Sequence, residues 1–190
     1  MLLALFFSLL LSFGYLLLES WMGKSAFLFK YREKGVYSMN DQKLQELLDR
    51  EGIKEVRALL AQALDYKDWA LFESLFLEEV EADFTAYGVP AQRVRREDLR
   101  GSYQHNLSRE GLRTQHISSN FRITVDGDTA RCISNFLAQH YIKGFEGGEE
   151  FFLRAEYTDH LVRTEAGWKI SALVLSQLFY TSGNATILMA

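Results

Sequence analysis

The sequence has few of the residues that cross-link or stiffen a chain. Among its 190 residues there is one cysteine, Cys132, and one proline, Pro90. A single cysteine excludes an internal disulfide framework and a multi-cysteine zinc module, and a single proline excludes a collagen-like chain. Basic residues are also outnumbered, with 21 Lys and Arg against 25 Asp and Glu. With no basic stripe to neutralise phosphates, we expect no nucleic-acid partner.

Motifs for bound nucleotides, catalytic metals and serine nucleophiles are missing as well. The chain has no phosphate-binding P-loop, no Gly-x-Gly-x-x-Gly turn, no His-Glu-x-x-His helix and no Gly-x-Ser-x-Gly elbow. These absences disfavour a nucleotide-dependent enzyme, a zinc protease and a serine hydrolase. We therefore expect no cofactor and no metal.

The chain does contain a sharp boundary near residue 38. Residues 1–18 are almost entirely apolar and uncharged, close to the roughly 20 residues that a helix needs to cross a bilayer. Basic residues follow this run, which by the positive-inside rule favours a cytoplasmic location for the remainder. Residues 1–38 are then a membrane anchor, a cleaved signal peptide, or an over-extended gene model whose true start is Met39. We predict a cytoplasmic domain over residues 39–190, with membrane contact only through residues 1–38.

Within this domain the apolar spacing changes from helical to strand-like. It predicts helices over residues 41–64, 69–76 (with Asp68 as N-cap) and 96–107, and a short strand over 80–86. Four long strands are predicted over residues 115–125, 129–142, 151–164 and 168–180. Helices followed by an antiparallel meander indicate an α+β fold, in which a bent sheet wraps around the first helix and encloses an apolar, cone-shaped pocket.

Several short motifs follow one another in an order that resembles a known family. They are residues 63–69 (ALDYKDW), Thr114-Gln115-His116 with Asn120, residues 126–130, His140, Tyr157-Thr158-Asp159 and residues 167–170. Over about residues 45–184 the chain is similar to the SnoaL-like branch of the nuclear transport factor 2-like superfamily. The resemblance implies a cone-shaped roll of a curved, mainly antiparallel sheet around amino-terminal helices, the nuclear transport factor 2-like or cystatin-like fold.

Among members of this superfamily, the site residues resemble those of scytalone dehydratases. The resemblance implies catalytic roles for Asp65, at the end of the first helix, and for His116 and His140, on two neighbouring strands. Two tyrosines of the dehydratase pattern are missing, because Leu64 and Phe84 occupy their positions. The residues expected to contact a ligand are Tyr66, Phe84, Tyr87, Asn120 and Tyr157.

Two imidazoles that face one cavity would supply acid–base chemistry. Histidine titrates near neutral pH, and elimination of water or migration of a double bond beside a carbonyl needs a base at carbon and an acid at oxygen. We expect Asp65 either to orient His140 by accepting from its ring or to act as the base itself. The predicted function is a cofactor-independent lyase or isomerase that acts on a small hydrophobic cyclic or polyketide-like substrate.

Other interpretations stay open. Asp65 and the two histidines could be a helix cap and satisfied core residues in a non-catalytic SnoaL-like module that binds a small ligand or dimerises. The chain could also resemble the small subunit of a ring-hydroxylating dioxygenase. Two histidines and one carboxylate have the composition of an iron site, although no metal motif supports one here. We expect the subunits to associate as a homodimer or homotrimer.

The strand register decides whether the two histidines share a face. A three-residue loop at residues 126–128 places His116 opposite Ala138 and on the face of His140, whereas a two-residue loop separates them. The apolar positions near this loop are odd-numbered, but both histidines are even-numbered. The pattern predicts one bulge between His116 and Phe121 and another before His140, or a twisted sheet that buries opposite faces at its two ends. His160, which follows Asp159 in a strand, is expected on the outer face.

Overall fold

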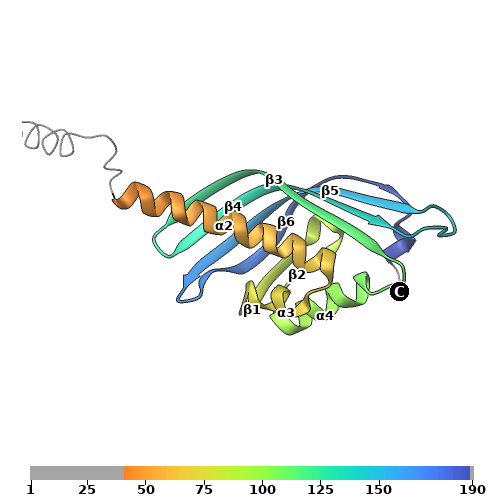
Figure 1. Ribbon diagram of the computed structural model, residues 1–190, viewed down its shortest axis with the longest axis horizontal. Coiled ribbons are helices and arrows are strands. Elements are labelled where there is room, and N and C mark those ends of the chain that lie inside the picture. The colour runs from red at the N-terminus through yellow and green to blue at the C-terminus, as the bar shows by residue number, and fades with distance from the viewer. Residues whose placement is uncertain (1–40, 189–190) are drawn as a thin grey trace, which may run out of the picture. The chain divides into compact units, whose positions relative to one another are not determined.

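The computed structural model describes residues 41–188, of which residues 45–188 belong to one compact unit (Figure 1). Its elements are α2 (Asp41–Tyr66), α3 (Trp69–Ser74), β1 (Phe76–Phe84), η1 (Thr85–Tyr87), β2 (Val89–Arg95), α4 (Arg96–Leu107), β3 (Arg113–Asp126), β4 (Thr129–Tyr141), β5 (Glu150–Thr164), β6 (Gly167–Gly183) and η2 (Ala185–Leu188). The interpretations of residues 1–38 lie outside the described residues.

The strands form one sheet in the order β2-β1-β6-β5-β4-β3. Every neighbouring pair is antiparallel except β1 and β6, which run parallel. Figure 1 shows α2 lying against the curved sheet, and α3 and α4 lie beside β1 and β2. The predicted α+β class and the curved, mainly antiparallel sheet with amino-terminal helices are confirmed.

Local sequence signals account for most element boundaries. The Asp68 side chain accepts from the backbone N–H of Leu71 at 2.9 Å, which confirms it as the N-cap of α3. Helix α4 has the predicted bounds. Strand β2 was not predicted, because none of its seven residues is buried and it contains Pro90. It pairs only with β1 and forms an edge of the sheet, where a proline is tolerated.

The register between β3 and β4 contains one of the two predicted bulges. Asp126 pairs with Thr129, so the loop has two residues, the alternative that by itself would separate the two histidines. A register shift between Ser119 and Arg122 nevertheless restores the pairing of His116 with Ala138. Buried positions of β3 accordingly change from even-numbered to odd-numbered at this bulge. The second bulge, before His140, is wrong, because the buried residues of β4 are even-numbered throughout.

Asn120 lies in this bulge with a positive φ of 53°, a conformation that costs a β-branched residue about 1–2 kcal/mol. We expect Asn120→Val to lower the free energy of unfolding by about this amount, and Asn120→Gly to leave it unchanged or raise it slightly. Urea denaturation of both variants measures the difference. Equal stability of the Val and Gly variants would show that the bulge does not depend on this backbone conformation.

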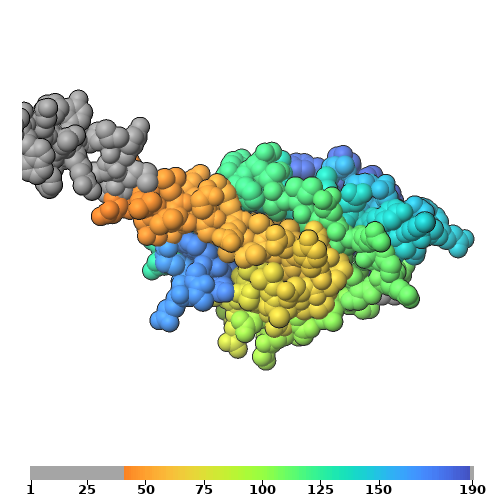
Figure 2. All heavy atoms as spheres, in the orientation of Figure 1, coloured from red at the N-terminus to blue at the C-terminus, as the bar shows by residue number. Residues whose placement is uncertain are grey.

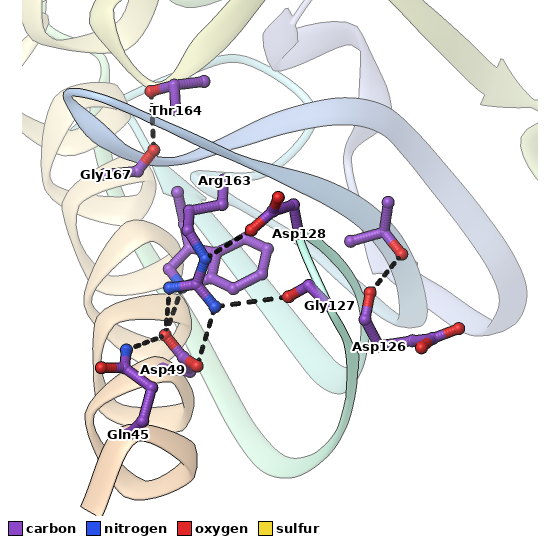
Figure 3. A network of polar contacts seen from close by, with 10 residues as sticks. Gln45, Asp49, Asp126, Gly127, Asp128, Arg163, Thr164 and Gly167 are labelled. Atoms are coloured by element: carbon purple, nitrogen blue, oxygen red, sulfur yellow. Dashed lines mark hydrogen bonds and ion pairs between the residues drawn. The ribbon is translucent and has the colours of Figure 1, made fainter. Parts of the chain in front are cut away.

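A polar network holds α2 against the loop between β3 and β4 (Figure 3). Arg163 on β5 donates to both carboxylate oxygens of Asp49, at 2.5 and 2.8 Å, and to Asp128 at 3.1 Å. Its guanidinium also lies 4.4 Å from the centre of the Trp168 ring, whose N–H donates to Asp49 at 3.3 Å. These contacts fix the placement of α2 on the sheet, and therefore the placement of Asp65 four to five helical turns further on.

Candidate active site

Asp65, in the last turn of α2, holds His116 of β3 at two points. Its Oδ1 lies 2.6 Å from His116 Nδ1, and its Oδ2 accepts the backbone N–H of His116 at 3.1 Å. The hydrogen bond that the sequence suggested between Asp65 and His140 is therefore made to His116 instead. The bulge at residues 119–122 and the placement of α2 together determine this pairing, because they bring His116 rather than His140 to the end of the helix.

These contacts fix the protonation pattern of the pair. A carboxylate only accepts hydrogen bonds, so the hydrogen of a neutral His116 ring lies on Nδ1 and the lone pair lies on Nε2. Burial by itself raises the pKa of Asp65, but the hydrogen bonds from the ring and backbone of His116 outweigh it, and the pKa lies below its usual value. Asp65 is therefore ionised at neutral pH and is placed to stabilise a protonated His116.

Two residues that sequence reasoning missed complete the contacts of Asp65. Thr114 Oγ1 lies 3.0 Å from Asp65 Oδ1, and Lys67 Nζ donates to Thr114 Oγ1 at 2.9 Å. Because an ammonium group cannot accept, the Thr114 hydroxyl hydrogen is directed to Asp65. Burial lowers the pKa of Lys67, and the nearby Asp65 partly opposes this. In the sequence, only the position of Thr114 indicated that it belongs to the site, because it precedes His116 by two residues on the same strand face.

His140 of β4 lies next to His116, with 5.7 Å between the ring centres and planes nearly perpendicular. Its Nδ1 lies 3.3 Å from the carbonyl oxygen of Phe151, which only accepts, so Nδ1 carries the hydrogen of the neutral ring. Burial and then the neighbouring His116 lower the pKa of His140 to about 4. The structure thus brings the two histidines together as expected, but His140 is neutral at pH 7 and holds no proton to give as an imidazolium acid.

This pKa makes a pH-dependent contribution to stability. The folded value, about 4, lies below the ordinary value of about 6.5, so between these pH values the unfolded chain binds more protons. Stability is therefore lost as the pH falls through this range. Between pH 7 and 4.5 we expect the wild type to lose about 2–3 kcal/mol more than His140→Phe in urea unfolding. The same pH dependence in both proteins would contradict the buried, neutral state of His140.

A groove of about 610 Å³ runs between α2 and β3 and reaches the Asp65–His116 pair. Both elements lie on the visible face of Figure 2. The lining of the groove combines small and apolar side chains with a charged rim: Glu51, Lys54, Glu55, Ala58, Ala61, Gln62, Asp65, His116, Ile117, Ser118 and Phe121. The volume falls within the range of small-molecule sites.

Deeper than this groove, around Arg57, little space is left between α2 and the sheet, and the interior is polar there. Arg57 of α2 and Asp159 of β5 are 2% and 0% exposed, and form an ion pair of 3.1 Å. The Arg57 guanidinium also lies 5.0 Å from the centre of the Tyr157 ring. Only about 10 Å³ of space remains beside Arg57, which is room for about one water molecule. At this point of the interior the structure has a buried ion pair and a small cavity in place of the open apolar space expected from the sequence.

The five residues expected to contact a ligand lie apart from the groove. Tyr66 is 82% exposed and Tyr87 42% exposed, and Asn120 is the exposed residue of the bulge. Phe84 packs edge-on against Tyr157, which borders the small interior cavity instead. Their ligand contacts stay predictions, and the structure offers Gln62, Ile117 and Ser118 at the groove in their place. His160, by contrast, is exposed as predicted.

Two further findings concern metals and membranes. Within residues 41–188, no three His, Cys, Asp or Glu side chains come together in a way that could hold a metal ion. None of the helices in the described part of the chain is long and apolar enough to span a bilayer.

Residues 45–174 match the SnoaL-like domain family, and the chain belongs to this family. Solved structures with the same fold include three distant relatives, each 22% identical to this chain. The first is a candidate scytalone dehydratase from Novosphingobium aromaticivorans, with a TM-score of 0.63 over 77% of this chain and 92% of that one. The second is a type 2 hexachlorocyclohexane dehydrochlorinase, LinA, with a TM-score of 0.61 over 78% of this chain and 97% of that one. The third is an NTF2-like protein with a cystatin-like fold from N. aromaticivorans, with a TM-score of 0.61 over 80% of this chain and 96% of that one. No curated protein gives a significant match.

Proposed function

We propose that the protein is a cofactor-independent lyase or isomerase in which His116 is the base. The observation that carries this proposal is the two-point contact of Asp65 with His116 at the edge of the groove. A histidine held for packing alone needs no ionised carboxylate that fixes its tautomer. Here the carboxylate leaves the basic Nε2 as the free nitrogen of the ring.

The reaction needs only one proton carrier. His116 Nε2 accepts a proton from a substrate carbon, and Asp65 stabilises the imidazolium that forms. The same imidazolium then returns the proton, either to a leaving oxygen, which completes an elimination, or to another carbon, which completes an isomerisation. His140 is the second proposed site residue, and its neutral Nε2 would accept a hydrogen bond from a substrate hydroxyl group or a water molecule.

The groove supports a small, mainly hydrophobic substrate. Ala58, Ala61, Ile117 and Phe121 offer apolar surface to it, and its volume of about 610 Å³ suits a ring-bearing molecule. Two relatives of the same fold are named as a dehydratase and a dehydrochlorinase, and both names describe elimination. These names support the reaction class, while the substrate itself stays open to experiment. The association of two or three subunits stays a prediction that gel filtration tests.

Elimination from 5-nitrobenzisoxazole tests the proposal, because this ring opens when a base removes one carbon-bound proton and the N–O bond breaks. Release of the coloured nitrophenolate follows the reaction. We expect saturable turnover by the wild type. A rate no greater than that of an equal concentration of free imidazole would overturn the proposal and favour a non-catalytic binding module.

Asp65→Asn separates orientation from binding in this assay. The amide keeps the size of the side chain but no longer stabilises an imidazolium or selects the Nδ1–H tautomer. We expect kcat to fall by about 10²-fold or more, with KM changed far less. Asp68→Asn, which alters an exposed helix cap three residues away, is the matched control. Unchanged kcat in Asp65→Asn would dismiss the orienting role.

A further inference from the structure

Removal of a proton from the carbon beside a carbonyl group needs a hydrogen-bond donor at the carbonyl oxygen. His140 is neutral and therefore does not act as a cationic donor. Ser118 occupies the next position along β3 on the same face as His116. It is the residue of β3 that borders both the groove and the small interior cavity. A side chain in this position can contact a molecule that also contacts His116.

The hydrogen bonds of Ser118 leave its own proton available. Arg57 Nη2 lies 3.1 Å from Ser118 Oγ, and a guanidinium group only donates, so Ser118 is the acceptor. Within residues 41–188 the Ser118 side chain makes no other hydrogen bond that would use its hydroxyl hydrogen. The contact with a buried cation also polarises the hydroxyl group and makes it a stronger donor than an ordinary serine.

Arg57 is held in place for this contact. It is 2% exposed, is paired with Asp159 and lies over the rings of Phe136 and Tyr157. Its Nε has no hydrogen-bond partner among the described residues. A buried arginine with an unsatisfied nitrogen is costly, and a purely hydrophobic core would avoid that cost. The arrangement is explained if the guanidinium serves the groove through Ser118.

We propose that the Ser118 hydroxyl group, polarised by Arg57, donates to the carbonyl oxygen of the substrate, and that the substrates are therefore ketones or other carbonyl compounds with a removable α-hydrogen. This inference rests on the proposed function, since it takes His116 as the base. Two residues along a strand place the side chains about 6.6 Å apart. A carbonyl group and its α-carbon span this gap when each end lies within hydrogen-bond reach.

The electron and proton balance is simple. His116 Nε2 takes the α-proton, and the C–H electron pair forms a carbon–carbon double bond while the carbonyl π pair moves to oxygen. The resulting enolate oxygen accepts the hydrogen bond from Ser118. In D₂O the protonated Nε2 of His116 exchanges its hydrogen with the solvent, so that a deuteron returns to the carbon and the restored ketone carries deuterium in place of the α-hydrogen. Ser118 touches the reacting oxygen, and Arg57 is a positioning residue that acts through it.

The test is the rate of α-hydrogen exchange of 2-tetralone in D₂O, followed by proton NMR. We expect Ser118→Ala to slow exchange by about 10²-fold, the effect of removing one donor to an oxyanion. Ser118→Thr, which keeps the hydroxyl group, should recover most of the rate. Ser119→Ala is the matched control, because Ser119 is exposed on the opposite face of the same strand. We expect this variant to catalyse the exchange of 2-tetralone at the wild-type rate.

A double variant tests the role of Arg57. Arg57→Met combined with Asp159→Leu removes both charges together and leaves no unpaired buried ion. We expect it to slow exchange, and we expect Ser118→Ala to have a smaller effect in this background than in the wild type. Equal effects of Ser118→Ala in both backgrounds would show that Arg57 does not act through Ser118.

The outcomes distinguish this inference from the proposed function. If His116→Gln abolishes both 2-tetralone exchange and 5-nitrobenzisoxazole elimination while Ser118→Ala matches Ser119→Ala, the donor role of Ser118 is wrong and the base role of His116 stands. If the wild type opens 5-nitrobenzisoxazole but does not exchange 2-tetralone, the assignment of carbonyl substrates is wrong. If His116→Gln changes neither reaction, the proposed function itself is wrong.

Discussion

His116→Gln is expected to slow base-dependent turnover by about 10²–10⁴-fold while the protein stays folded. Glutamine has no basic nitrogen, so the proton acceptor is lost. Its amide group is able to donate to Asp65 in place of Nδ1–H, and Asp65 keeps its hydrogen bonds from Thr114 and from the backbone N–H at position 116. The carboxylate is therefore not left as an unpaired buried charge. The measurements are initial rates with 5-nitrobenzisoxazole and the melting temperature of each protein.

His160→Gln is the matched control for this prediction. His160 carries the same side chain on a long strand of the same sheet, but it is exposed. A general contribution of surface histidines to proton transfer would lower the rate in both variants alike. If His116→Gln melts close to the wild-type temperature and keeps the wild-type rate, His116 is a core residue without a part in proton transfer.

Local signals in the sequence predicted the elements well, since each depends on a few adjacent residues. Asp68 capped α3 as expected, and residues 96–107 formed α4. The bulge between His116 and Phe121 was also predictable, because the apolar positions near the loop are odd-numbered whereas His116 is even-numbered, and the buried positions of β3 do change parity across the bulge. In each case the information lies within one element or one turn, where periodicity and capping apply directly.

The composition of the site depended on contacts between distant elements. The sequence could not tell whether Asp65 contacts His116 or His140, because the answer depends on a two-residue loop, a bulge and the position of α2 together. Arg57 was missed because a charged residue normally marks the exposed side of a helix, and only its partner Asp159 on β5 allows its burial. Tyr66 follows Asp65 in sequence but points to solvent, since adjacent helical residues face different directions.

The buried ion pair gives the largest expected change in stability. Arg57→Met alone removes the cation and leaves Asp159, which is 0% exposed, without a charged partner. We expect the free energy of unfolding at pH 7 to fall by about 3–5 kcal/mol. The double variant Arg57→Met/Asp159→Leu should recover most of this loss, because no charge stays buried. Urea denaturation of both proteins, with the m-value checked for a two-state transition, measures the two effects.

The pH dependence identifies the cause of the loss. Burial raises the pKa of Asp159 to about 6 in the wild type, although Arg57 opposes the shift. The folded chain therefore binds more protons than the unfolded chain between about pH 6 and 4, and this carboxyl group becomes less destabilising as the pH falls. Without Arg57 the pKa of Asp159 should rise further. The difference in the free energy of unfolding between the wild type and Arg57→Met should therefore be smaller at pH 5.5 than at pH 8. A deficit of the same size at both pH values would assign the loss to packing around the arginine side chain rather than to the unpaired charge.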